Sequence, residues 1–352
     1  MSSTCTQLGR AVARAGVAGN PSDALGGAAF AVPIQGLFAT VELRESTRLS
    51  VRASRSVAGW SSIGELVEHA GRYGHDGGDR LVSAAIVTLS RHLDTVGGEL
   101  PGNIDPGTLD ARARRDTGDP FEAVWSTNIP RSVGLAGSSA IITATLRAVA
   151  ERWKVELTPQ VLAALALETE AVELGVAAGW MDRAVQANDV PTLVDTRITS
   201  TEGGHLVPAM TPVRPGGPIE LVVAWDPSGA APSGRLHGEL HDRAIAGEPL
   251  VVRTVELLAE AAGTAADAVA RVDLDALAAA VDATCELRDA LGALDRSTAA
   301  LAAIARAHAS AATSAGSGGA VLAVPRGLGG EQLAEIFRDH GAQAVALTLG
   351  SP

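Results

Sequence analysis

The hydrophobic residues of the chain follow two spacings, and each spacing predicts one kind of secondary structure. Apolar residues that alternate with polar ones, or that form short β-branched runs, are typical of strands. The first 45 residues show this pattern on either side of a glycine-rich turn at 19–27. The predicted strands lie within residues 11–18, 28–43, 121–127, 191–213, 219–225, 313–324 and 342–349.

Apolar residues three or four positions apart predict helices, and from residue 247 onward alanine strengthens that pattern. The segment 96–119 is rich in Gly, Pro and Asp and predicts a loop, and residues 176–187 predict a loop that leads into a short helix. The chain then ends in β-α-β, which predicts an α+β domain with 219–225 as an additional strand. The predicted helices cover residues 78–93, 138–154, 159–174, 250–262, 274–291, 297–308 and 331–340.

Length and charge limit the kinds of partner. The 352 residues suffice for two domains with sizeable cores, and a boundary is expected within 191–215. The net charge of −12 argues against nucleic acid as the main partner. Lys154 is the single lysine, so a Walker A loop is excluded. An anion would have to be held by backbone N–H groups, serines and arginines.

The cysteines and the apolar runs bear on location. Cys5 and Cys285 lie far apart, without the spacing of a zinc or redox motif, which favours a reducing compartment. No run reaches the roughly 18 apolar residues of a membrane span, and polar residues interrupt any signal-peptide core near residue 20. We expect a cytoplasmic protein, either a monomer or a homodimer, without nucleic-acid or membrane partners.

The stretch "NIPRSVGLAGSSAIITATLRAV" at 128–149 places glycines and serines before an apolar helix. Gly134 and Gly137 permit positive φ and close approach of a ligand, and Ser138 stands where a helix N-cap is expected. The first N–H groups of a helix are unpaired and stabilise an anion. Ser138 and Ser139 add hydroxyls for phosphate oxygens or magnesium. An ordinary capped helix explains this stretch equally well.

Three further features of the sequence, taken one at a time, do not indicate a functional site. Glycine turns at 19–27 and 316–319 fit plain connections between elements. Asp182 follows a Gly-Trp-Met loop and adjoins Arg183, which is usual for a solvated surface pair. Glu170 and Glu173 lie on the preceding helix.

Together these segments resemble the three motifs of the GHMP kinases, a superfamily of small-molecule kinases. "ARAGVAGNPSD" is similar to the first motif, "GLAGSSAIITATL" to the second and "AGSGGAVLAV" to the third, in matching order over nearly the whole chain. Within the superfamily, "GNPSD", "NIPR" and "SGRLH" are most similar to glucuronokinases. The resemblance implies an α+β GHMP kinase fold, with a ribosomal-protein-S5-like N-terminal ATP-binding domain (1–195) and a ferredoxin-like C-terminal domain (196–352).

The resemblance also implies a site for ATP and Mg²⁺. Asp182 would be the catalytic base, and Arg14 would steady it and the phosphate charge. Ser139 and Glu170 would bind Mg²⁺, with Glu173 as the reserve. Trp125 and the loop 96–119 are guesses for the adenine pocket. The ATP phosphates would lie against Gly134, Leu135, Ala136, Gly137, Ser138, Ser139, Ala140, Gly316, Gly318 and Gly319.

The acceptor implied by the resemblance is a sugar hydroxyl, in particular the anomeric C1 hydroxyl of a uronic acid such as glucuronate. Its contacts would come from Asn20, Asp23, Arg131, Arg183 and His237, although each of these arginines also fits a surface charge. A bulky aromatic residue is expected after "GNPSD" and a Phe-Thr pair before "GSGGAV", but the chain has Ala-Leu and Ser-Ala there. Another sugar, a cyclitol, an isoprenoid precursor or a catalytically silent sensor therefore stays open.

Overall fold

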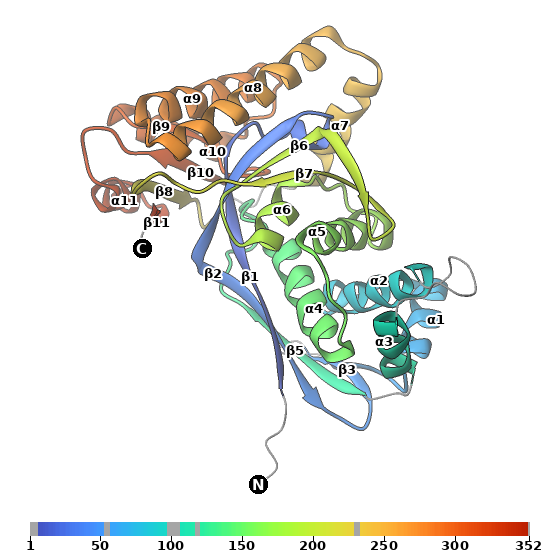
Figure 1. Ribbon diagram of the computed structural model, residues 1–352. Coiled ribbons are helices and arrows are strands. Elements are labelled where there is room, and N and C mark those ends of the chain that lie inside the picture. The colour runs from blue at the N-terminus through green and yellow to red at the C-terminus, as the bar shows by residue number, and fades with distance from the viewer. Residues whose placement is uncertain (1–5, 53–56, 97–105, 117–119, 229–232, 351–352) are drawn as a thin grey trace.

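Two long strands at the start of the chain, β1 and β2, form the centre of the first sheet (Figure 1). The computed structural model describes residues 6–52, 57–96, 106–116, 120–228 and 233–350. The strand order is β4-β3-β5-β2-β6-β7, with β1 paired to β2, and every pairing is antiparallel except that of β3 with β5. The strands are β1 (Gln7–Ala18), β2 (Ala28–Glu45), β3 (Leu49–Arg52), β4 (Val57–Trp60), β5 (Phe121–Thr127), β6 (Thr192–Glu202) and β7 (His205–Pro212).

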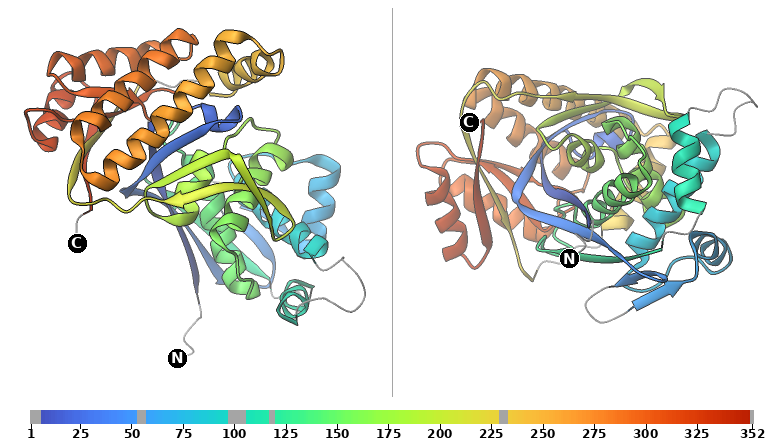
Figure 2. Two further views of the ribbon diagram at one scale, coloured as in Figure 1. Left: turned by 45° about the horizontal axis from the view of Figure 1, so that its top comes forward. Right: turned by 60° about the horizontal axis from the view of Figure 1, so that its bottom comes forward.

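Helices fill the curve of this sheet, and Figure 2 shows the strands bending around them. The second half of β1 is buried at every position because helices cover both of its faces. Residues 106–116 form a helix where a loop was expected. Its first residue is proline and it is rich in Ala and Arg, which suits a helix start and interior. These helices are α1 (Ile63–Tyr73), α2 (Arg80–Val96), α3 (Pro106–Asp116), α4 (Gly137–Trp153), α5 (Pro159–Glu168) and α6 (Met181–Asn188).

The second sheet is antiparallel with the order β11-β8-β10-β9. Residues 219–225 do supply a strand beside the terminal β-α-β unit, as predicted, and that strand pairs with both β10 and β11. Helices pack on this sheet and lie at the opposite end of the molecule from α1–α3 (Figure 1). The elements are β8 (Ile219–Trp225), α7 (Ser233–Ile245), α8 (Pro249–Arg271), α9 (Leu274–Ala290), α10 (Arg296–Ala307), β9 (Ala311–Ser314), β10 (Ala320–Val324), α11 (Gly330–Asp339) and β11 (Gln343–Leu349).

Several boundaries differ from the predicted ones, and two of the larger differences concern helices. Helix α8 continues nine residues past Ala262, because Gly263 weakens a helix by only about 1 kcal/mol and does not end it. The predicted helix 159–174 changes after residue 168 into the π-helical turn η2 (Thr169–Glu173), which carries Glu170.

The expected domain boundary at 195/196 falls inside β6. Because β6 pairs with β2 and β7, the first sheet continues to residue 212. We therefore propose the linker 213–218 as the boundary. One continuous hydrophobic core crosses it, since Phe30 of β2, Ala265 of α8 and Leu322 of β10 belong to the same buried cluster. The two sheets are thus fixed against each other.

None of the helices in the described ranges is long and apolar enough to cross a membrane. Cys5 lies outside the described residues, and Cys285 is buried as a free thiol.

Candidate active site

A cleft of about 970 Å³ opens where the three glycine turns meet. Its walls come from β1, the 3-10 turn η1 (Ser22–Ala24), β5, α2, α4, η2, α6 and the turn between β9 and β10. Segments that are up to about 300 residues apart in the sequence therefore share one cavity. The motif residues that line it are Arg14, Asn20, Asp23, Gly134, Leu135, Ala136, Gly137, Ser138, Glu170, Asp182, Arg183 and Ser317.

The start of helix α4 is bare. Its N-cap is Ala136, in the left-handed conformation (φ 62°), and no side chain caps it. The expectation that Ser138 is the N-cap is wrong, because the helix already begins at Gly137. The first N–H groups of α4 therefore lack a capping side chain at the cleft, where they suit an anion.

Two glycine turns pack directly against each other beside this helix start. A Cβ on Gly134 (φ 76°) would lie 2.7 Å from the Gly318 carbonyl oxygen. A Cβ on Gly316 would collide with the Gly134 carbonyl and the Arg14 guanidinium. Only glycine permits this approach, so the second and third motif segments form one floor.

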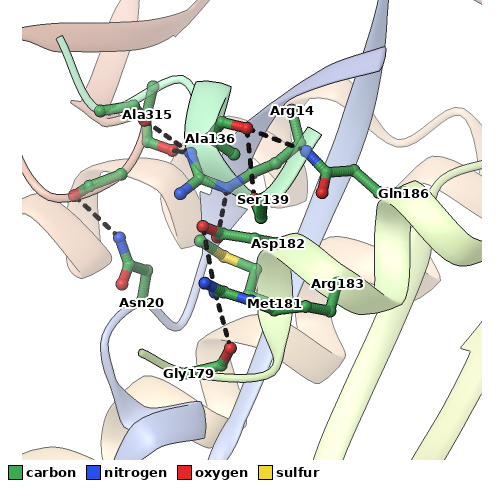
Figure 3. Close-up of polar contacts among 12 residues, drawn as sticks. Arg14, Asn20, Ala136, Ser139, Gly179, Met181, Asp182, Arg183, Gln186 and Ala315 are labelled. Atoms are coloured by element: carbon green, nitrogen blue, oxygen red, sulfur yellow. Dashed lines mark hydrogen bonds and ion pairs between the residues drawn. The ribbon is translucent and has the colours of Figure 1, made fainter. Parts of the chain in front are cut away.

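Arg14 of β1 connects this floor to Asp182, at the start of α6 (Figure 3). Its Nε donates to Asp182 Oδ1 at 2.6 Å, and its NH1 donates to the carbonyls of Gly134 (2.6 Å) and Ala315 (2.8 Å). Arg14 is buried, whereas the Asp182 carboxylate is 17% exposed and faces the cleft. A guanidinium with three fixed acceptors leaves the carboxylate little freedom to turn.

Arg183 lies between Glu170 and Asp182. Its guanidinium forms an ion pair with Glu170, lies 3.3 Å from Asp182 Oδ2 and donates to the Gly179 carbonyl at 2.9 Å. Burial, together with repulsion from Arg14, lowers the pKa of Arg183 to about 9, and Asp23 opposes that shift. The expected role of Arg183 as a contact for an acceptor carboxylate does not fit, because two carboxylates of the protein already occupy it.

The serine pair is turned differently from the expectation. Ser139 is fully buried, and its hydroxyl donates to the Ala136 carbonyl in its own helix (Figure 3). Ser138 is exposed to the cleft, and its hydroxyl donates to Glu170 Oε1 at 2.7 Å. The buried hydroxyl of Ser139 is therefore turned away from the position expected for a magnesium ligand, and Ser138 is the serine of the pair that lines the cleft.

Glu173 is not a reserve ligand. Its carboxylate accepts from His75 Nε2 at 2.8 Å and is paired with Arg91 of α2, away from the cleft. Among the described residues no three His, Cys, Asp or Glu side chains gather around a metal position. Mg²⁺ commonly uses one or two carboxylates and completes its shell with phosphate oxygens and water. Glu170 and Ser138 fit that requirement, with a bound nucleotide supplying the remaining oxygens.

The turn after β1 forms another wall. Asn20 Nδ2 donates to the Gly316 carbonyl at 2.9 Å, and Asp23 Oδ2 accepts from Met181 N–H at 2.9 Å. Arg131 is exposed at the cleft and makes no ion pair with any other described residue. His237 lies in α7, but its side chain is outside the described residues.

Sequence reasoning missed two residues. Gln186 is buried and donates to the carbonyls of Val12 (3.1 Å) and Ala136 (3.0 Å), which holds the N-cap of α4 in place. Its position could have indicated this role, because Gln186 follows Asp182 by one helical turn and therefore lies on the same face of α6. Arg80 begins α2 and lines the cleft with no ion pair inside the described ranges; the Gly77-Gly78 turn before a helix was its signal.

The two serines give a matched test. Ser138→Ala is expected to raise the Mg²⁺ concentration for half-maximal rate about tenfold, because it removes a hydroxyl that contacts the metal-binding carboxylate. Ser139→Ala is expected to leave that concentration unchanged, since the Ser139 hydroxyl is buried and donates within its own helix. Initial rates at varied Mg²⁺ measure both, and the reverse order of effects would restore Ser139 as the ligand.

Comparisons with known proteins agree with this geometry. Residues 108–188 match the family model "GHMP kinases N terminal domain". Glucuronokinase 1 of Arabidopsis thaliana is 26% identical over 324 residues, which cover 89% of this chain and 83% of that protein. Among solved structures, Streptococcus pneumoniae phosphomevalonate kinase with phosphomevalonate and AMPPNP matches at TM-score 0.73 (14% identity, covering 97% of this chain and 99% of that one).

Lactococcus lactis galactokinase complexed with galactose matches at TM-score 0.71, with 17% identity over 99% of this chain and 94% of that one. The mixed fold of helices and sheets expected from the motifs is thus confirmed. The resemblance to the GHMP kinases is also confirmed: residues 108–188 match the N-terminal domain of that family, and the chain is similar in fold to a phosphomevalonate kinase and a galactokinase.

Proposed function

We propose that the protein is an ATP-dependent sugar kinase. The observation that carries the proposal is the Arg14–Asp182 pair, held 2.6 Å apart beside the bare start of α4 in a cleft large enough for two substrates. Phosphoryl transfer depends mainly on positioning and charge neutralisation, and these groups provide both. A silent sensor would have no need to keep this pair together with Glu170 and Ser138.

Each group has a role in transfer. The N–H groups of α4 and the two glycine turns would hold phosphate oxygens, while Glu170 and Ser138 would hold Mg²⁺, which would neutralise phosphate charge. ATP supplies the phosphoryl group. Asp182 accepts a hydrogen bond from the acceptor hydroxyl, orients it and takes its proton as transfer proceeds. Arg14 keeps that carboxylate in place.

The acceptor that we propose is a uronic acid such as glucuronate, phosphorylated at its anomeric hydroxyl. Similarity to glucuronokinase along 89% of the chain supports this choice, and the galactose complex of a structural neighbour supports a sugar in this cleft. A carboxylate is best held by a bidentate arginine. Arg131 is the cleft arginine of the expected set that has no ion pair to another described side chain.

Arg131→Gln tests this carboxylate contact. We expect the KM for a uronic acid to rise about tenfold or more, because a charge-assisted bidentate contact is lost, while the KM for ATP changes little. Arg44→Gln is the matched control, since Arg44 is an exposed arginine of β2 outside the cleft, and it should leave both KM values unchanged. A larger effect of Arg131→Gln on the KM for ATP would assign Arg131 to the phosphates instead.

A panel of acceptors tests the function itself. ATP consumption is measured with uronic acids, neutral hexoses, cyclitols and isoprenoid alcohols, and phosphorus NMR of the product identifies the phosphorylated hydroxyl. Turnover with a uronic acid and an anomeric phosphate supports the proposal. Turnover restricted to a neutral sugar or a cyclitol would replace the acceptor, and tight sugar binding without any turnover would favour a sensor.

A further inference from the structure

Arg288 is a buried cation that forms no ion pair with any carboxylate of the described residues. It lies on α9, in the C-terminal half, and is 1% exposed. Its NH1 donates to the Asn20 carbonyl at 3.2 Å and its NH2 to the Ala293 carbonyl at 3.0 Å, while Nε has no hydrogen-bond partner among the described residues. Burial lowers the pKa of Arg288 to about 10. A buried charge without a counter-ion is costly, so its contacts call for an explanation.

Thr284 lies one helical turn before Arg288, on the same face of α9. Its hydroxyl accepts a hydrogen bond from the Gly19 N–H at 3.2 Å and donates its own proton to the Ala280 carbonyl at 2.8 Å. Two consecutive residues of the first motif, Gly19 and Asn20, are therefore held by two side chains of one helix. These contacts span more than 260 residues of sequence.

The segment that α9 holds leads straight into the cleft. The Asn20 side chain bonds the Gly316 carbonyl, which also accepts from Ser314 Oγ at 2.9 Å. Three residues further, Asp23 accepts from the N–H of Met181, the residue before Asp182. A shift of the Gly19–Asn20 backbone would thus move the Asn20 amide and the Asp23 carboxylate, the two groups expected to contact the sugar, relative to the Asp182 carboxylate.

We propose that Arg288, together with Thr284, is a positioning residue for acceptor binding. It fixes the Asn20 carbonyl so that the Asn20 amide and the Asp23 carboxylate stay aligned with Asp182. Its guanidinium spans the Asn20 and Ala293 carbonyls with two separate nitrogens, which its planar fork of donors makes possible. The inference rests on the proposed function, because it assigns this wall of the cleft to the acceptor.

Kinetics of three variants and one control variant separate positioning from general stability. Arg288→Met is expected to raise the acceptor KM about tenfold, the effect of losing a charge-assisted hydrogen bond, with the KM for ATP changed less than about twofold. Arg288→Lys keeps the charge on a single donor nitrogen and should recover part of the loss. Thr284→Val, which preserves shape, should raise the acceptor KM severalfold and serves if Arg288→Met does not fold. Cys285→Ala is the control. Cys285 lies between Thr284 and Arg288 in the sequence, but its side chain belongs to the hydrophobic core cluster around β8, β10 and α11, so its loss should leave the acceptor KM unchanged.

Hydrogen exchange without substrates supplies an independent measurement. In Arg288→Met and Thr284→Val, amides in residues 19–27 should exchange faster, while those in α11 keep the wild-type rate. Unchanged acceptor KM and unchanged local exchange in an active enzyme would overturn the positioning role alone. Wild-type protein that phosphorylates no acceptor would instead overturn the proposed function, and exchange in 19–27 would then decide whether Arg288 orders the turn.

Discussion

Asp182→Asn is expected to lower kcat by about 10³-fold, within the range found for the loss of a general base. Asparagine keeps the size of the side chain and an oxygen that accepts from Arg14 Nε, but it cannot take the proton of the acceptor hydroxyl. The dissociation constant for ATP should stay within about twofold of the wild-type value, because in our proposal the start of α4 and the glycine turns, not Asp182, hold the phosphate groups.

A coupled assay gives kcat, and calorimetric titration gives the ATP affinity. Asp189→Asn is a suitable control, because Asp189 follows the same helix α6 and pairs with Arg147 at 2.8 Å on the surface, away from the cleft. That variant should turn over at the wild-type rate. Turnover of Asp182→Asn near the wild-type rate would remove Asp182 as the base.

Arg14→Met is expected to damage both stability and catalysis. The substitution leaves the Asp182 carboxylate without its buried partner and deprives two carbonyls of their donor. Breaking a buried pair by removing one partner costs about 3–5 kcal/mol in the free energy of unfolding. Because Asp182 also loses its orientation, kcat should fall at least as far as in Asp182→Asn.

Denaturant unfolding and kcat, measured on the same preparations, check this expectation. Arg44→Met is the control, since Arg44 pairs with Glu42 at 2.7 Å on the exposed face of β2, and its loss should leave the free energy of unfolding close to the wild-type value. The double variant Arg14→Met/Asp182→Asn should lose less stability than the two single losses added together, because the pair is then removed as a unit. Full additivity would contradict the coupling between Arg14 and Asp182.

The backbone conformation of the glycine turns at the site was predictable from the sequence. Gly134 and Gly316 stand where the backbone needs positive φ or a close approach, and such needs leave a mark in the residue type. The helix behind them was visible from its apolar spacing. Most strands and helices were predicted for the same reason, because each buries a face that has its own period.

The rest depended on differences of one residue or on distant contacts. A helix turns by about 100° per residue, so moving its start by one position decides whether Ser138 or Ser139 faces the cleft. The π-helical turn at η2 places Glu170 opposite Arg183, and no residue pattern announces such a turn. The contacts of Arg288 with Asn20 cross 268 residues, and a single sequence carries no trace of which distant groups meet.

The bonds of Arg14 limit how this activity can be transplanted. This one β1 side chain binds the carbonyl of Gly134, the carbonyl of Ala315 and the carboxylate of Asp182. The two carbonyls lie in different halves of the molecule. The stretch recognised by the family model, 108–188, contains only part of that constellation. Transfer of this stretch alone into another kinase should therefore not transfer the activity. A chimera should remain active only if its β1 and its β9–β10 turn come from the same protein as this stretch.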